Sequence, residues 1–424
     1  MDREFVQSIS ETVDRLEAEA IERLQELIRI PSVTGSEHDV QQAVGRQMNE
    51  LALDIDMWEP DAAELLPYAE HVGEFESLAG RPNVVGTRRG SGSGRSMILN
   101  AHIDTVEAGD PAQWSVDPFL AEHTQGKVFG RGSCDMKAGL VAELIALRAL
   151  DEAGVTLHGD VFVESVISEE DGGAGALATI LRGYTADAAI ITEPTNLAII
   201  PAQGGSLVFR LTITGLSAHA CVRNEGVSAL EKFIPIHTAI LAHERGHHEA
   251  ITHPLYQRFE NRAPINIGTV RAGNWPSSVP ESIVVEGRAG LVPGESLDDT
   301  RSALVETIQR AANADPWLAA HPPRIDWFSG QFAAAETSID HPLMHTLQNA
   351  HLATTGSAAV IDAATYGADM RHFTNFGRIP CVMYGPGDVR RAHRPDEFVP
   401  VSEVLTVAKT LAVALSAWCG ANHT

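Results

Sequence analysis

The chain has 424 residues, of which 44% are hydrophobic and 21% charged, a composition typical of a globular protein and not of a disordered or fibrous one. This length exceeds one ordinary core, so two or three domains, or one large domain with an insertion, are expected. A formal net charge of −25 repels nucleic-acid phosphates and anionic membranes, so neither is an expected partner.

The cysteines and the apolar segments bear on the cellular location. The four cysteines lack C-x-x-C spacing, which argues against a disulfide framework and against a thiolate zinc site. The first residues carry acidic side chains and no apolar leader. The apolar stretch 404–419 contains Lys409 and is expected to be too short to span a bilayer. We therefore expect a cytoplasmic protein.

Hydrophobic periodicity predicts an N-terminal helix over residues 3–29, after which strands and helices alternate. Helical patterns occupy residues 138–150 and 174–181. Apolar runs predict buried strands over residues 96–103, 160–168, 188–192 and 381–384. This alternation predicts an α/β fold with a mainly parallel sheet and helices on both of its faces.

The pattern changes between residues 206 and 335. Strand patterns there alternate polar and apolar residues, as half-buried antiparallel strands do. The predicted strands are 207–214, 265–271, 282–291 and 324–328, and the predicted helices are 227–243 and 297–314. We expect a smaller α+β domain over residues 206–335, inserted into a catalytic domain formed by residues 1–205 and 336–424.

One histidine-rich segment contains the match His243-Glu-Arg-Gly-His247 to the H-E-x-x-H motif. On a helix the two histidines would share a face and Glu244 would act as general base, with His253 as a third metal ligand. However, Gly246 is expected to end the helix before this face is complete. An endopeptidase built on these residues is therefore a rival hypothesis and not the favoured one.

Chemically active residues recur where the predicted sheet strands end, which is where open α/β sheets bind ligands. The five motifs are Asn100-Ala-His-Ile-Asp-Thr-Val106, Gly130-Arg-Gly-Ser-Cys-Asp-Met-Lys-Ala-Gly139, Ile167-Ser-Glu-Glu-Asp-Gly-Gly173, Ile191-Thr-Glu-Pro-Thr195 and Ala392-His-Arg-Pro-Asp-Glu397. Side chains alternate along a strand, so His102 and Asp104 point the same way, and Asp104 can accept the N–H of a metal-binding imidazole. The adjacent Glu169 and Glu170 project differently, so one can bind a metal while the other acts as a base.

Together these motifs supply two imidazoles and three carboxylates, which suits two divalent ions that share a bridging carboxylate. The candidate ligands are His102, Asp135, Glu170, Glu193 and His393. The ordered set H-x-D, G-R-G-x-x-D-M-K, S-E-E, E-P-T and A-H-x-x-D-E resembles the M20 metallopeptidase family over nearly the whole chain. Members of that family include acetylornithine deacetylase, succinyl-diaminopimelate desuccinylase, aminoacylase and glutamate carboxypeptidases.

The resemblance implies a role for each residue at the strand ends. His102 and Glu193 would bind one ion, with Asp104 behind His102, while Glu170 and His393 would bind the other. The cofactors would be two divalent ions, with zinc favoured and cobalt or manganese as alternatives.

Asp135 would bridge the two ions, and Glu169 would be the general base and acid. The family also implies a cis peptide between Asp135 and Met136.

The inserted domain carries two further residues that match the family. Gly215-Leu-Ser-Ala-His-Ala220 resembles the G-x-S-A-H motif, which implies that His219 stabilises the oxyanion in the other subunit of a homodimer. Arg288 resembles an arginine that grips a substrate carboxylate. The chain departs from the family here, because N-x-V-P is replaced by Ser277-Ser-Val-Pro280 and the interval after Arg288 is longer.

The expected activity is metal-dependent hydrolysis of the amide bond in a small N-acyl amino acid. A metallo-dipeptidase or a glutamate-type carboxypeptidase is the runner-up, and a non-catalytic metal-binding protein is a remote alternative. Asp369 and Arg371 resemble another family loop, where a structural ion pair and a substrate contact both remain open.

Overall fold

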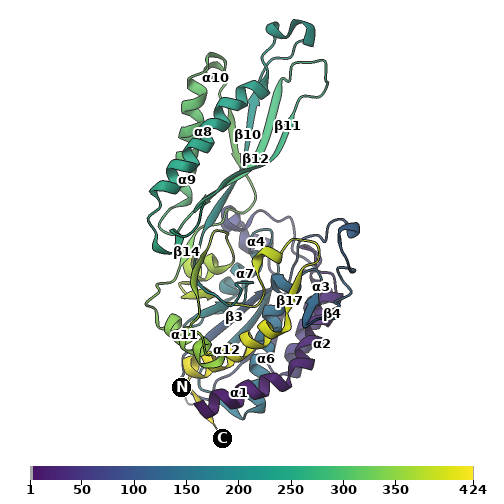
Figure 1. Ribbon diagram of the computed structural model, residues 1–424, viewed down its shortest axis with the longest axis vertical. Coiled ribbons are helices and arrows are strands. Elements are labelled where there is room, and N and C mark those ends of the chain that lie inside the picture. Colours follow the sequence, from purple (N-terminus) through teal and green to yellow (C-terminus); the bar gives the residue numbers. More distant parts are fainter. Residues whose placement is uncertain (1–2, 424) are drawn as a thin grey trace.

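The computed structural model describes residues 3–423 and divides them between a large lobe and a smaller one (Figure 1). The large lobe contains both chain ends, and the smaller lobe is formed by the middle of the chain. Each lobe has its own cluster of buried hydrophobic side chains.

A sheet of nine strands organises the large lobe, in the order β1-β2-β7-β3-β8-β16-β9-β14 with β15 beside β9. Its four central strands, β7, β3, β8 and β16, run parallel, and antiparallel strands flank them. The bounds are β1 Asp54–Trp58, β2 Asn83–Arg88, β3 Met97–His102, β7 Val161–Val166, β8 Ala189–Ile191, β9 Ile199–Gln203, β14 Ala335–Glu336, β15 Ile361–Ala364 and β16 Cys381–Met383. The predicted α/β fold with a mainly parallel sheet is confirmed.

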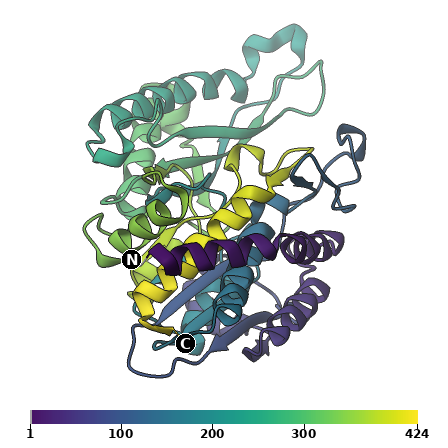
Figure 2. The ribbon, with the colours of Figure 1, turned by 60° about the horizontal axis from the view of Figure 1, so that its bottom comes forward.

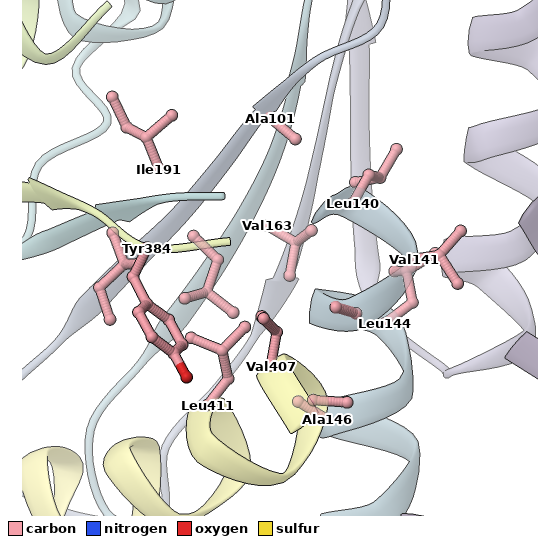
Figure 3. Close-up of a cluster of buried hydrophobic side chains, with 14 of the residues drawn as sticks. Ala101, Leu140, Val141, Leu144, Ala146, Val163, Ile191, Tyr384, Val407 and Leu411 are labelled. Carbon is pink, nitrogen blue, oxygen red and sulfur yellow. The ribbon is translucent and has the colours of Figure 1, made fainter. Parts of the chain in front are cut away.

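Helices cover both faces of this sheet. One face carries α6 (Ala138–Glu152) and α12 (Val401–Cys419), and Val163 of β7 packs there with side chains such as Leu144 and Leu411 (Figure 3). Since neighbouring side chains of a strand point to opposite faces, Glu164 lies on the other face, where Thr179 of α7 (Ala174–Arg182) donates a hydrogen bond to it. The short helices α4 (Ala62–Leu65) and α5 (Ala69–Val72) pack in the same apolar cluster as α7.

The predicted N-terminal helix is two helices, α1 (Arg3–Arg15) and α2 (Glu17–Arg29), which break at Leu16. Both helices contact α6 and α12: α1 crosses over α12 (Figure 2), and α2 also contacts α3 (His38–Glu50). The break allows both amphipathic faces to cover one curved core, and α11 (Pro342–Thr355) completes this layer beside α12.

The smaller lobe is a four-stranded antiparallel sheet in the order β11-β12-β10-β13 with helices packed on it. Its elements are β10 Gly205–Thr214, α8 Ala229–Ala250, β11 Ile265–Ala272, β12 Ser282–Leu291, α9 Leu297–Asn313, α10 Pro316–Ala320 and β13 Arg324–Trp327. We propose that this lobe is the inserted domain, with bounds at residues 206 and 335.

Two small sheets complete the large lobe. One joins β4 (His123–Thr124), β5 (Lys127–Phe129) and β17 (Phe398–Pro400), and the other joins β6 (Val155–Leu157) to β18 (Ala421–His423).

Helix α12 is long and apolar enough to cross a membrane by length and composition, contrary to the expectation that this stretch is too short. Most of it is nevertheless buried inside the large lobe, where it packs against α6 and α11. Its hydrophobicity is therefore explained by its position in the core.

Candidate active site

The predicted metal ligands meet at one edge of the central sheet. His102 ends β3, Glu170 follows β7 and Glu193 follows β8, so the carboxyl ends of three adjacent parallel strands supply them. Asp135 lies in the turn before α6, and His393 lies in the loop after β16. A cavity of about 430 Å³ is lined by four of these ligands, Asp135, Glu170, Glu193 and His393, and by Glu169.

Asp135 lies between two imidazoles. His102 Nε2 is 3.0 Å from Asp135 Oδ1, and His393 Nε2 is 3.5 Å from Asp135 Oδ2. His393 Nε2 also lies 3.0 Å from Glu170 Oε1. Burial alone would raise the pKa of Asp135, but hydrogen bonds from both imidazoles hold it well below its usual value. Each oxygen of this carboxylate therefore faces a different histidine, as a bridging ligand requires.

These donor atoms fit a divalent cation. Ligand atoms of His102, Asp135 and Glu170 all lie within 4.8 Å of one another. Burial raises the pKa of the nearby Glu193 to about 8, because the opposing effect of His102 does not offset burial and the neighbouring carboxylates. A bound cation would stabilise the ionised carboxylates, and imidazole and carboxylate ligands suit zinc and similar metals.

Glu169 is buried, with 8% of its surface exposed, and it lines the cavity beside the ligands. Burial raises its pKa well above that of an ordinary glutamate, and the neighbouring Glu170 and Glu193 raise it further. A carboxyl group with a raised pKa can both accept a proton and return it near neutral pH.

Asp104 makes a contact that differs in detail from the expected one. His102 Nδ1 lies 2.9 Å from the backbone oxygen of Asp104 and 3.7 Å from its carboxylate. The carboxylate instead accepts hydrogen bonds from the backbone N–H groups of Glu169 (3.1 Å) and Glu170 (3.3 Å) and from the Thr34 hydroxyl (2.8 Å). Asp104 thus orients the imidazole through its backbone and the glutamate turn through its side chain, while burial raises its pKa to about 7.

Sequence reasoning did not assign a role to Glu397, which holds the Asp135 turn. Its carboxylate accepts hydrogen bonds from the backbone N–H groups of Cys134 (2.9 Å) and Asp135 (3.1 Å) and forms a buried ion pair with Arg131. Both partners belong to quoted motifs, so the signal was present in the sequence. The peptide bond between Asp135 and Met136 is cis, as expected.

Arg288 of β12 lines the same cavity as the ligand cluster, together with Ser206 and Val208 of β10. Among residues 3–423 its guanidinium has no hydrogen-bond or ion-pair partner, and its Nε is buried. Burial lowers the pKa of Arg288, because no anion offsets the lost hydration. The aromatic side chains of Phe332 and Tyr366 form another part of the wall. The cavity is therefore lined both by the unpaired guanidinium of Arg288 and by the candidate metal ligands.

His219 is exposed on the smaller lobe and does not line this cavity. Its Nδ1 accepts a hydrogen bond from the backbone N–H of Cys221 at 3.2 Å, and the Cys221 thiol lies 2.9 Å from the same nitrogen. With Nδ1 occupied as an acceptor, a neutral imidazole carries its proton on Nε2. The Nε2–H group of His219 is therefore free to donate a hydrogen bond. In this arrangement of the lobes it does not reach the cavity of its own chain.

The histidine-rich segment remains helical, so the expectation that Gly246 ends the helix is wrong. An exposed glycine costs a helix roughly 1 kcal/mol relative to alanine, and the packing of α8 against α9 and the sheet outweighs this cost. The side chains are otherwise engaged: His247 pairs with Glu295, and Glu244 accepts hydrogen bonds from Asn261 and from the backbone of Ile265. Within the described part of the chain, the group that could hold a metal is His102, Asp135 and Glu170.

Asp369 and Arg371 are each 1% exposed and do not line the cavity. They are 4.0 Å apart at their nearest atoms, so their ion pair is loose. These positions argue against a direct substrate contact for either residue.

Two relatives of known name are similar to this chain over most of its length. The N-formyl-4-amino-5-aminomethyl-2-methylpyrimidine deformylase of Bacillus subtilis is 28% identical over 90% of this chain and 89% of its own length. The acetylornithine deacetylase of Proteus mirabilis is 27% identical over 94% of this chain and 96% of its own length.

Solved structures show the same fold. The dipeptidase Dug1p of Saccharomyces cerevisiae has a TM-score of 0.78 at 14% identity and covers 99% of both chains. A tripeptidase of Staphylococcus aureus has a TM-score of 0.74 at 20% identity and covers 95% of this chain and 98% of its own. The model of peptidase family M20/M25/M40 matches residues 98–417. The chain therefore belongs to peptidase family M20/M25/M40 and is a metal-dependent amidohydrolase.

Proposed function

We propose that the protein hydrolyses the amide bond of a small N-acyl amino acid, using two divalent ions, with zinc as the favoured metal. The observation that carries this proposal is Arg288, an unpaired guanidinium in the same cavity as Glu169 and the ligand cluster. A buried guanidinium recognises a carboxylate through two parallel hydrogen bonds. A substrate with a free carboxylate near its scissile amide would satisfy both parts of the cavity.

The metal site would be formed by the residues at the strand ends. His102 and Glu193 would hold one ion, Glu170 and His393 the other, and Asp135 would bridge them. Such ions supply Lewis acidity, which polarises a carbonyl and lowers the pKa of water.

Glu169 takes the proton of the attacking water and returns it to the departing amine, so that one water molecule is added across the C–N bond. Asp104 keeps the Glu169 backbone in place during both transfers. His219 donates its Nε2 proton in a hydrogen bond to the developing oxyanion.

His219 requires a second chain for this role, so we propose a homodimer formed through the smaller lobe. That lobe exposes several large hydrophobic side chains, and its edge strand β11 is exposed along most of its length. The exposed side chains are Leu216, Leu230, Ile234, Val270 and Trp275. Exposed apolar surface and an unpaired strand edge are features that a subunit interface covers.

A cytoplasmic location is part of the proposal. The four cysteines, Cys134, Cys221, Cys381 and Cys419, are all free thiols, as a reducing compartment allows.

A substrate panel tests the proposal. Protein supplied with zinc or cobalt should hydrolyse N-acetyl, N-formyl or N-succinyl amino acids with a higher kcat/KM than the formylated aminomethylpyrimidine named for one relative. The name of that compound contains no carboxyl group for Arg288 to bind. Preference for the pyrimidine, or no turnover of any acyl amino acid, would overturn the proposal. Preference for dipeptides would favour the dipeptidase alternative.

A further inference from the structure

The buried guanidinium of Arg371 contacts three segments of the large lobe. Nη1 donates to the backbone oxygen of Ala368 at 2.7 Å, and Nη2 donates to the backbone oxygen of Gly172 at 2.7 Å. Its central carbon lies 3.7 Å from the centre of the Phe332 ring. With 1% of its surface exposed, Arg371 makes these contacts out of reach of solvent.

The contact with Gly172 concerns the turn that carries the proposed base. Gly172 lies in the tight turn 168–173, where its N–H bonds the backbone oxygen of Glu169 at 3.1 Å. Asp104 holds the start of this turn through the N–H groups of Glu169 and Glu170. Arg371 holds its other end through the Gly172 carbonyl. The two glutamates are thus fixed from both sides.

The other two contacts concern the wall of the cavity, because Ala368 and Phe332 both line it. The rigid, planar guanidinium of Arg371 therefore fixes the distance between the turn of Glu169 and the cavity wall formed by Ala368 and Phe332. A lysine could not reproduce this, since its ammonium is a single point and has no plane to stack on an aromatic ring.

An ion pair with Asp369 does not account for the position of Arg371. The two groups are 4.0 Å apart, and neither Asp369 oxygen has a hydrogen-bond partner among residues 3–423. The best-formed contacts of the guanidinium are those with the two carbonyls. Asp369 serves mainly as a nearby counter-charge.

We propose that Arg371 is a positioning residue that sets the distance between the turn of Glu169 and Glu170 and the cavity wall formed by Ala368 and Phe332. The inference rests on the proposed function for its effect on turnover, but not for its effect on the turn itself. A misplacement of about 1 Å in an active site can cost 10²-fold in rate, so loss of this contact should lower kcat by about that factor.

The test compares Arg371→Met and Arg371→Lys with the wild type by amide hydrogen exchange and by kinetics. Exchange in the segment 168–175 should quicken by about tenfold or more in Arg371→Met, since the local opening free energy falls when a buried hydrogen bond is lost. In Arg371→Lys, which keeps one donor, the exchange rate of this segment should lie between those of the wild type and Arg371→Met. Millimolar guanidinium should restore both protection and kcat in Arg371→Met, and KM should change less than kcat.

Arg88→Met is the matched control, because Arg88 also donates to a backbone oxygen, that of Leu147, at a distance from the cavity. It should leave exchange at 168–175 and kcat unchanged. Unchanged exchange at 168–175 in Arg371→Met would overturn the inference, as would faster exchange throughout the chain without rescue by guanidinium. If the wild type hydrolyses no substrate, the proposed function fails while the exchange experiment still decides the role of Arg371.

Discussion

Replacing Arg288 by methionine removes the guanidinium and keeps a side chain of similar reach. In the free protein this cation is largely buried and has no partner among residues 3–423, so the cost of its burial is already present before substrate binds. A substrate carboxylate would then gain two charge-assisted hydrogen bonds with little further desolvation of the arginine. Such bonds contribute about 1.5–3 kcal/mol each, so we expect a loss of roughly 3 kcal/mol, or about 10²-fold in kcat/KM.

The assay is a cycle of two enzymes and two substrates: wild type and Arg288→Met, each with an N-acyl amino acid and with its α-carboxamide. The variant should lose about 10²-fold on the acid and little on the amide, which gives a coupling of roughly 3 kcal/mol. Arg210→Met serves as control, because Arg210 lies in the same sheet but is paired with Glu286. Equal losses on both substrates would refute carboxylate recognition by Arg288.

Three further changes have defined outcomes. Glu169→Gln should lower kcat by about 10²-fold or more with metal still bound, and near-normal turnover would rule out its role as the base. Burial raises the pKa of Glu164 to about 8, above its unfolded value of 4.5, so the contribution of this group to stability is fully present below pH 4.5 and is lost as the pH rises from there through 8. Glu164→Gln should therefore unfold in urea like the wild type near pH 4.5 and be about 3 kcal/mol more stable at pH 7, and equal stability at both pH values would contradict this sign. Mixing inactive Glu169→Gln and His219→Ala chains should restore about a quarter of wild-type activity, because half of the randomly formed dimers are mixed and each mixed dimer contains one intact site out of two. If dimers shown to be mixed recover no activity, His219 has no role in the partner's site.

Local sequence patterns predicted the elements that place the ligands. Alternation along β3 indicated that the side chains of His102 and Asp104 share a direction, and apolar runs located the ends of β3, β7 and β8. These features depend on near neighbours in the chain, and the parallel arrangement of the strands then brings their carboxyl ends to one edge of the sheet.

Features set by distant segments could not be predicted in the same way. The break at Leu16 and the continuation of α8 past Gly246 follow from packing against other elements of the same lobe, which overrides local helix propensity. The hydrogen bonds of Arg371 join Gly172 to Ala368. These two residues lie almost 200 positions apart in the sequence, so no local pattern predicts the contact. Asp104 was predicted to face the imidazole. Its hydrogen bonds to the backbone of Glu169 and Glu170 could not be predicted, because they also depend on the pairing of β3 with β7.

The most direct measurement is the number of divalent ions that the metal-depleted protein binds, followed by calorimetry in wild type, His102→Ala and His243→Ala. A metal centre at the strand ends predicts two ions per wild-type chain, loss of ion binding and of amide hydrolysis in His102→Ala, and no change in His243→Ala. Full binding and hydrolysis in His102→Ala, or the loss of both in His243→Ala, would contradict it.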